Sequence, residues 1–207
     1  MSFYREHVLP PLLDLAMAQK ELTARRAALI ARAAGRTLEI GIGSGLNLPF
    51  YDPAVERLDG IDPSPALLRR ARQRANAVPF PIELHEGSAE HLPFEAHVFE
   101  TAVMTWTLCS VADPVRVLRE VRRVLVPEGL LLFAEHGLAP EAGVAAWQHR
   151  LTPLWCRVAG GCHLDRQPDQ LLRSAGFDIG QLTTGYMRGP RVMAWGTYQY
   201  QGQARPS

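Results

Sequence analysis

The sequence predicts an α/β fold whose mostly parallel sheet is covered by helices on both faces. Strand-like and helix-like patterns alternate along the chain, which is typical of such sheets. An apolar stretch over residues 37–42 enters a glycine-rich turn, and a second stretch over residues 57–61 ends at the acidic Asp62. Ligands of these folds bind where the carboxyl ends of the strands meet, so the two segments predict the binding edge of the sheet.

Each element is predicted from a local pattern. A helix over residues 12–34 is rich in Ala, Leu and Arg and stops at Gly35. Asp113 and Pro114 open a helix that runs to residue 125. A short turn at residues 188–190 makes the last two strands antiparallel. The other predicted helices cover residues 65–76, 142–159 and 168–175, and the strands cover residues 37–42, 57–61, 81–85, 97–105, 130–135, 177–186 and 192–200.

Charge and cysteine content exclude several classes of function. The formal net charge of +1 leaves no basic footprint for nucleic acid. The cysteines at 109, 156 and 162 form no Cys-x-x-Cys pair and no zinc spacing along the chain, so no metal is expected. With no signal peptide and no apolar run of membrane-spanning length, the sequence indicates a cytoplasmic enzyme.

The turn after residue 40 has the spacing Gly-x-Gly-x-Gly, at positions 41, 43 and 45. A pyrophosphate-binding turn would need a glycine at Leu46, and no phosphate-cradling Gly-x-x-x-x-Gly-Lys motif is present. The pattern therefore favours a nucleoside without phosphates, with Glu39 near a cationic group, which describes S-adenosylmethionine. A purely structural glycine turn is the alternative.

Asp62 follows Glu39 at close to the distance at which an acid meets a nucleoside ribose in a βαβ unit. A carboxylate accepts charge-assisted hydrogen bonds from both ribose hydroxyls. The alternative is that Asp62 caps the helix that begins near Pro63 or Ser64. Its pairing with the glycine turn favours the ligand.

These motifs resemble those of the class I S-adenosylmethionine-dependent methyltransferases across nearly the whole chain. Residues 39–45 resemble the family's first motif, Asp62 its ribose-binding acid, residues 86–94 its adenine segment and residues 119–129 the turn before its fifth strand. The resemblance implies a Rossmann-like fold with a mostly parallel seven-stranded sheet and an antiparallel last strand. It also implies cofactor contacts from Glu39, Gly41, Gly43, Gly45, Asn47, Asp62, Pro63, Ser88, Ala89, Glu90 and Thr105. Ser88 replaces the usual adenine-binding acid, which passes that contact to the Ala89 backbone or to water.

We expect one methyltransferase domain over residues 1–207. Within it, residues 1–35 form an N-terminal helical cover, residues 36–136 the cofactor-binding half, and residues 137–200 the acceptor-side helices with the last two strands. Residues 201–207 are expected to be a polar tail.

Within the superfamily the chain resembles the thiol S-methyltransferases and their bacterial relatives. The resemblance rests on residues 45–51, on Thr-Leu-Cys-Ser-Val at 107–111, on Ala-Glu-His at 134–136, and on Trp155 with Gly-Gly-Cys-His-Leu at 160–164. It implies a small, lipophilic acceptor such as a thiol. A weaker resemblance to phospholipid N-methyltransferases and quinone-precursor C-methyltransferases leaves those acceptors open. A separate alternative is a cofactor-binding regulatory protein that keeps the fold without turnover.

A thiol acceptor gains from a base, because a thiol with a pKa of about 8.5 is mostly protonated at neutral pH. His136 is the first candidate base, since it ends a strand at the binding edge; a histidine that positions a loop is the alternative. His163 with Asp165 competes for the same role. Cys109 is expected to line the pocket, and Cys162 is open to either interpretation.

The acceptor pocket is expected to be apolar. Its expected lining comes from segments that follow the fourth and fifth strands: Trp106, Trp147, Leu154, Trp155 and Val158. Tyr4, His7 and the helix from Leu12 are expected to cover the cofactor, with packing of that helix on the sheet or peripheral contact with a membrane as alternatives. The sequence gives no oligomeric state.

Overall fold

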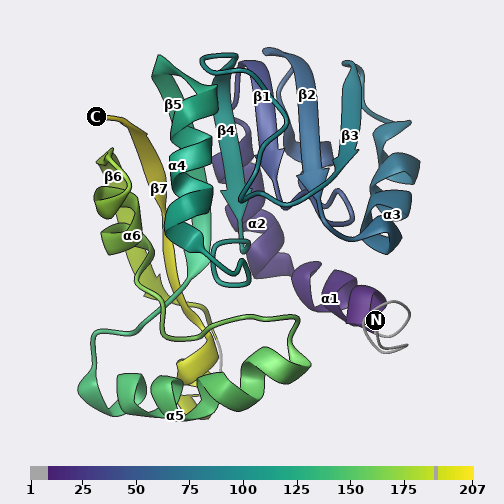
Figure 1. The fold of residues 1–207 in the computed structure, drawn as a ribbon. Coiled ribbons are helices and arrows are strands. Elements are labelled where there is room, and N and C mark those ends of the chain that lie inside the picture. Colours follow the sequence, from purple (N-terminus) through teal and green to yellow (C-terminus); the bar gives the residue numbers. More distant parts are fainter. Residues whose placement is uncertain (1–8, 189–190) are drawn as a thin grey trace.

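The structure is a computed structural model that describes residues 9–188 and 191–207, so Tyr4 and His7 lie outside the described residues. Strands and helices alternate along most of the chain (Figure 1). The helices are α1 (Leu9–Met17), α2 (Lys20–Ile30), α3 (Pro65–Ala75), α4 (Pro114–Val124), α5 (Ala142–Val158) and α6 (Pro168–Ser174). The strands are β1 (Gly35–Ile40), β2 (Val55–Asp62), β3 (Ile82–Glu86), β4 (Phe99–Thr105), β5 (Leu125–His136), β6 (Phe177–Tyr186) and β7 (Tyr198–Pro206). Two 3₁₀ helices are η2 (Leu48–Phe50) and η3 (Arg191–Gly196).

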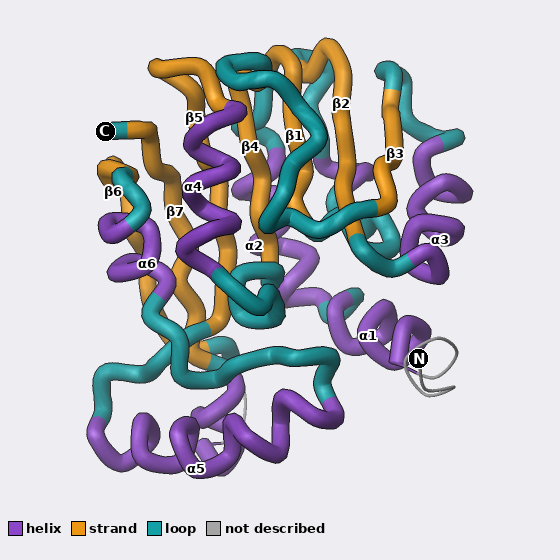
Figure 2. Tube along the Cα trace, in the orientation of Figure 1, coloured by secondary structure: helices purple, strands orange, loops and turns teal. Residues whose placement is uncertain are grey.

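The strands form one seven-stranded sheet in the order β3-β2-β1-β4-β5-β7-β6 (Figure 2). The first five strands are parallel, and β7 runs antiparallel between β5 and β6. The predicted Rossmann-like fold with its antiparallel last strand is confirmed. The strand order reverses between β1 and β4, which in such sheets is where a ligand crevice opens at the carboxyl ends.

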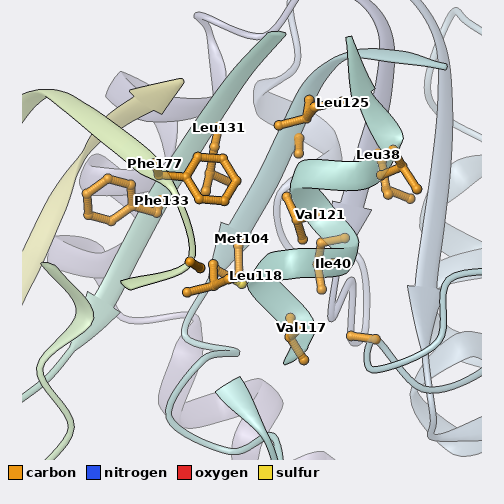
Figure 3. Packing of buried hydrophobic residues seen from close by; sticks show 14 of the residues in the cluster. Leu38, Ile40, Met104, Val117, Leu118, Val121, Leu125, Leu131, Phe133 and Phe177 are labelled. Carbon is orange, nitrogen blue, oxygen red and sulfur yellow. The ribbon is translucent and has the colours of Figure 1, made fainter. Parts of the chain in front are cut away.

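Two apolar layers cover the two faces of the sheet. On one face, α4 and α6 pack against alternate residues of β1, β4 and β5 (Figure 3). Val117, Leu118 and Val121 of α4 are fully buried there, at the three- and four-residue spacing of an amphipathic helix. On the other face, Leu29 and Ile30 of α2 pack against β2, β4 and β5. The buried layers hold the carboxyl ends of the strands at one edge.

The predicted helix over residues 12–34 is wrong as one element, because α1 ends at Met17 and α2 begins at Lys20. The Arg26 side chain donates a hydrogen bond to the Met17 carbonyl at 2.6 Å and so satisfies the end of α1. Asp14 of α1 accepts hydrogen bonds from Ser44 of the glycine turn and from Arg74 of α3. These contacts turn α1 away from the line of α2 and attach it beside the glycine turn.

The bounds of the last predicted strand, 192–200, are also wrong. Residues 191–196 form η3, and β7 extends through most of the segment expected to be a polar tail. β7 pairs with a strand on each side, so its backbone hydrogen bonds hold it in the sheet even though many of its side chains are polar. One of these polar side chains, Gln203, accepts a hydrogen bond from Arg32. β7 therefore lacks the apolar alternation that marks a strand in sequence.

Helices α1 and α5 both lie beyond the edge to which the arrows of β2 and β4 point (Figure 1). Helix α1 lies near the glycine turn after β1, whereas α5 lies below β5 and β7. Within the described residues, no helix has the length and apolar character needed to cross a bilayer. The two helices flank the edge at which the predicted site residues gather.

Candidate functional site

The glycine turn connects β1 to η2 in a conformation that needs glycine. Gly41, Gly43 and Gly45 all have positive φ angles, of 67°, 56° and 79°. A Cβ on Gly41 would lie 2.3 Å from Oγ1 of Thr107, in the loop after β4. The turn therefore passes close to the β4 loop, across the point where the strand order reverses.

Asp62 ends β2 and faces this turn. Its Oδ2 accepts a hydrogen bond from the Gly43 backbone at 3.0 Å, and its Oδ1 accepts one from the Ser64 backbone at 2.8 Å. The side chain that caps α3 belongs to Ser64, which accepts from the Leu67 backbone. Burial raises the pKa of Asp62, and the two backbone hydrogen bonds oppose that rise. Asp62 thus holds the glycine turn and retains unused lone pairs for a ligand.

Glu39 is the buried centre of a polar network. Asn47 Nδ2 donates to its Oε1 and the Tyr51 hydroxyl to its Oε2, both at 2.8 Å. Asn47 Nδ2 also reaches Oγ1 of Thr105, at the end of β4, at 3.0 Å. Burial raises the pKa of Glu39 to about 7, although both hydrogen bonds lower it. Sequence reasoning missed the role of Tyr51, because its partner lies 12 residues earlier on another element.

The network leaves one acceptor unused. Oδ1 of Asn47 is buried and has no hydrogen-bond partner among the described residues. A buried acceptor beside a carboxylate suits a ligand that brings a positive charge and N–H donors. The amino acid portion of S-adenosylmethionine has both, so these residues fit that group.

The predicted adenine segment follows β3. Ser88 donates a hydrogen bond to the Glu90 carboxylate, and Glu90 Oε1 accepts from the Ala112 backbone at 3.0 Å, just before α4. Ala89 is buried beneath them. The Ser88 hydroxyl therefore already has a hydrogen-bond partner within the chain.

His136, Cys162 and Cys109 meet at the tips of β4 and β5. His136 Nε2 lies 2.8 Å from Cys162 Sγ, and the Trp155 indole N–H donates to the same sulfur at 3.3 Å. A hydrogen bond from the Cys109 thiol lowers the pKa of Cys162. The same bond, together with burial, raises the pKa of Cys109 well above its usual range. The three side chains therefore form one cluster at the tips of β4 and β5.

His163, the second candidate base, lies on the same loop but faces outward. Its side chain is 41% exposed, and Nδ1 is 3.9 Å from Asp165. Burial and Arg166 lower the pKa of His163. Asp165 makes a shorter hydrogen bond, 3.0 Å long, with Nδ1 of His149 in α5. The cluster at β5 therefore includes His136 and not His163.

Two buried polar side chains that sequence reasoning left without a role hold this region in place. Glu135 Oε1 accepts from the backbones of Thr107 and Leu108, at 2.9 and 3.0 Å, and so fixes the loop that carries Cys109. Gln148 of α5 accepts from the Ala139 backbone and donates to the carbonyls of Gly137 and Leu164. Gln148 thereby joins the end of β5 to the loop that carries Cys162. An isolated glutamine in a helix gives no sequence pattern for such a role.

The predicted pocket lining is only partly brought together. Trp155 packs edge-on against Trp195 with ring centroids 5.3 Å apart, next to Cys162. Trp147, Leu154 and Val158 were expected beside it, but they lie on the outer face of α5 and are 58%, 61% and 47% exposed. Their spacing of seven and four residues puts them on one side of the helix, and buried Gln148 and Thr152 lie on another side.

Comparison with known proteins identifies the family. A methyltransferase domain model matches residues 38–133. A thiol S-methyltransferase of Rattus norvegicus is 35% identical over 162 residues, which cover 70% of this chain and 61% of the relative. A phosphatidylethanolamine N-methyltransferase of Cereibacter sphaeroides is 34% identical over 129 residues, covering 61% and 63%. The chain thus spans less than two thirds of the length of these two relatives.

Two further comparisons cover more than two thirds of the matched protein. A demethylmenaquinone methyltransferase of Deinococcus radiodurans is 31% identical over 165 residues, covering 75% of this chain and 68% of the relative. The solved structure of an S-adenosylmethionine-dependent methyltransferase of Thermotoga maritima superposes with a TM-score of 0.65 at 20% identity, covering 97% and 99% of the two chains. The chain belongs to the class I S-adenosylmethionine-dependent methyltransferases, and S-adenosylmethionine is its cofactor.

Proposed function

We propose that the enzyme transfers the methyl group of S-adenosylmethionine to the sulfur of a small, lipophilic thiol. The observation that carries this proposal is the contact of His136 with Cys162 beneath Trp155, at the edge where the cofactor motifs lie. It brings a histidine and an aromatic side chain together at that edge of the sheet. The 35% identity to a protein named as a thiol S-methyltransferase supports the same acceptor.

The cofactor is held between the glycine turn and the ends of β2, β3 and β4. In this proposal Asp62 accepts the ribose hydroxyls, and Asn47 and Glu39 face the amino acid portion. The backbone around Ala89 faces the adenine, and Thr105 orients Asn47. Pro63, Ser88 and Glu90 complete the loops around the nucleoside.

Methyl transfer from a sulfonium is an in-line displacement in which the cofactor loses its charge. Alignment of donor and acceptor accounts for about 7–11 kcal/mol in favourable intramolecular cases. A thiol must also lose its proton, and in this proposal His136 accepts it, because His163 is 41% exposed and faces Asp165.

Turnover on a panel of acceptors tests the proposal. With S-adenosylmethionine and each acceptor in turn, aliphatic and aromatic thiols are expected to give methyl thioethers, with kcat/KM rising as the thiol becomes more apolar. Phenols, quinol precursors and phosphatidylethanolamine are expected to give no product. Methylation of any of these three classes in preference to every thiol would overturn the assignment of the acceptor.

A phospholipid acceptor is the second candidate, and exposed apolar side chains favour it. Leu12 and Leu15 of α1 are 52% and 75% exposed, and Trp147 and Leu154 of α5 lie near the same edge of the sheet. Such faces suit peripheral contact with a membrane surface. Co-sedimentation with phosphatidylethanolamine vesicles, lost in Leu15→Asp but kept in Leu182→Asp, would support this candidate when it accompanies methylation of the lipid.

Cofactor affinity is expected to depend on pH through Glu39. Burial raises its pKa to about 7 in the free protein, so the carboxyl is largely protonated below neutrality. The cationic cofactor favours the carboxylate and lowers that pKa, so affinity rises as pH increases toward about 7 and then levels off. The gain is about tenfold for each unit by which the cofactor lowers the pKa.

Calorimetry on either side of neutrality, in buffers of different ionisation enthalpy, measures both this affinity and the protons released. Glu39→Gln keeps an acceptor for Tyr51 but does not titrate. It is the matched control and should show a flat profile between pH values of about 6 and 8. Identical profiles for the wild type and Glu39→Gln would assign the titration to another group.

A further inference from the structure

Three potential metal ligands converge from distant parts of the chain. Cys109 lies in the loop after β4, His136 ends β5, and Cys162 lies in the loop after α5. One ligand atom from each residue lies within 4.8 Å of the other two. The absence of zinc spacing along the sequence does not bear on this group, because each ligand comes from a different element.

The distances suit a tetrahedral ion after small side-chain rotations. Zinc binds sulfur at about 2.3 Å and imidazole nitrogen at about 2.0–2.1 Å, so ligand atoms around it lie about 3.5–3.8 Å apart. His136 Nε2 is 2.8 Å from Cys162 Sγ, and the whole group spans at most 4.8 Å. Two sulfurs and an imidazole are ligands that select zinc over magnesium or calcium.

The backbone around the three side chains is fixed by hydrogen bonds. The backbone N–H of His163, next to Cys162, donates to the Cys109 carbonyl at 2.8 Å. Gln148 bonds the carbonyls of Gly137 and Leu164, each within two residues of a proposed ligand. Rigid support of this kind holds a site in its binding geometry before the ion arrives.

The charged and polar neighbours of the three side chains are compatible with a bound divalent cation. Trp155 donates its N–H to Cys162 Sγ, as an outer partner of a thiolate ligand does. Glu135 is buried beside His136, and its Oε2 has no partner in the described part of the chain. Arg166, which bonds the Leu108 carbonyl, is the nearby cation. With both cysteines as thiolates, the group itself carries two negative charges, which a divalent cation would neutralise.

A second group of potential metal ligands consists of Asp59, Glu83 and His85, and its carboxylates already have arginine partners. Asp59 lies 3.3 Å from Arg57 and 3.6 Å from Arg36, and Glu83 also contacts Arg57. Arginines already neutralise those carboxylates. Within residues 9–188 and 191–207, no arginine forms such an ion pair with Cys109, His136 or Cys162.

We propose that Cys109, His136 and Cys162 bind one zinc ion whose fourth position is open to the acceptor thiol. Two cysteines and one histidine with an open position form a catalytic type of zinc site. The metal site stands on its own geometry, whereas its role in catalysis rests on the proposed function. In the metal-bound enzyme the ion replaces His136 as the group that favours the thiolate.

The acceptor would react as a coordinated thiolate. On binding zinc, the thiol releases its proton to solvent. A sulfur lone pair then forms a bond to the methyl carbon of S-adenosylmethionine. The bond from that carbon to the sulfonium breaks, and its electron pair stays on the cofactor sulfur, giving S-adenosylhomocysteine. The methyl thioether is a neutral, weak ligand, and it leaves the ion.

Metal content tests the site directly. After chelation and reloading with zinc, we expect one zinc per chain in the wild type and in Cys156→Ser, the matched cysteine outside the group. We expect none in Cys109→Ser and Cys162→Ser. Reloading with cobalt should give a thiolate-to-cobalt charge-transfer band in the first two proteins only. Circular dichroism identifies a variant that has not folded, and the chelated wild type provides a metal-free protein without substitution.

The outcomes separate the site from its role. No zinc and no cobalt band in the wild type, or a Cys109–Cys162 disulfide formed in its place, would overturn the site. If zinc binds and its removal abolishes thiol turnover while S-adenosylhomocysteine affinity holds, both site and role are supported. If zinc binds and its removal leaves turnover unchanged, the role is overturned. Zinc binding without turnover on any thiol would support the site and contradict the proposed function.

Discussion

Replacing His136 by alanine should lower turnover on a lipophilic thiol by about 10²–10⁴-fold, the usual range for loss of a positioned acid or base. Cofactor affinity should hold, because the side chain contacts Cys162 and none of the residues of the glycine turn. The expected loss applies with or without bound zinc, since the imidazole assists thiolate formation either as base or as ligand. Steady-state kinetics with saturating S-adenosylmethionine measures it.

The pH dependence separates deprotonation from positioning. As pH rises through the thiol pKa of about 8.5, solvent supplies the thiolate and the deficit of His136→Ala should shrink. His163→Ala is the comparison variant, and its turnover should stay close to that of the wild type because the side chain is 41% exposed and faces Asp165. A deficit that stays constant above the thiol pKa would assign His136 a positioning role. A larger loss in His163→Ala would exchange the two assignments.

The cofactor half could be predicted because its determinants are local. Gly41, Gly43 and Gly45 lie within five residues, and each adopts a positive φ that other residues rarely adopt. Asp62 ends the next strand, β2, which pairs in parallel with β1. Alternation of strands and helices then predicts parallel pairing, and the observed sheet agrees. Each of these predictions uses only patterns within one element or between elements that follow one another in sequence.

The acceptor half could not be predicted in the same way. The group formed by Cys109, His136 and Cys162 depends on the packing of α5 against the end of β5, through contacts such as those of Gln148. No spacing in the sequence encodes that approach. The outward face of α5 shows the converse error: Trp147 and Leu154 are apolar, but apolar character alone does not say which side of a helix faces the sheet.

Boundaries failed where hydrogen bonds to distant groups replaced apolar patterns. The break between α1 and α2 depends on Arg26 bonding the Met17 carbonyl and on Asp14 reaching Ser44 and Arg74. Strand β7 is polar, yet it pairs on both sides. In both cases the energy comes from partners on other elements, which a local pattern does not contain.

Asp62→Ala should weaken S-adenosylmethionine binding by tenfold or more. Each hydrogen bond lost from a charged acceptor costs about 1.5–3 kcal/mol, and about 1.4 kcal/mol corresponds to a factor of ten in Kd. Asp62→Asn keeps an acceptor for only one of the Gly43 and Ser64 backbone N–H groups and loses the charge, so its affinity should lie between those of the wild type and the alanine variant. Calorimetry with S-adenosylhomocysteine measures all three.

The structure supplies a control that isolates the helix cap. Ser64→Ala removes the side chain that caps α3 and should lower the free energy of unfolding by about 0.5–2 kcal/mol while cofactor affinity holds. Asp62→Ala should show the opposite balance, with a large loss of affinity and a smaller loss of stability. If Asp62→Ala instead matches Ser64→Ala in both measurements, the carboxylate serves only to fold the turn. The ribose would then need another acceptor.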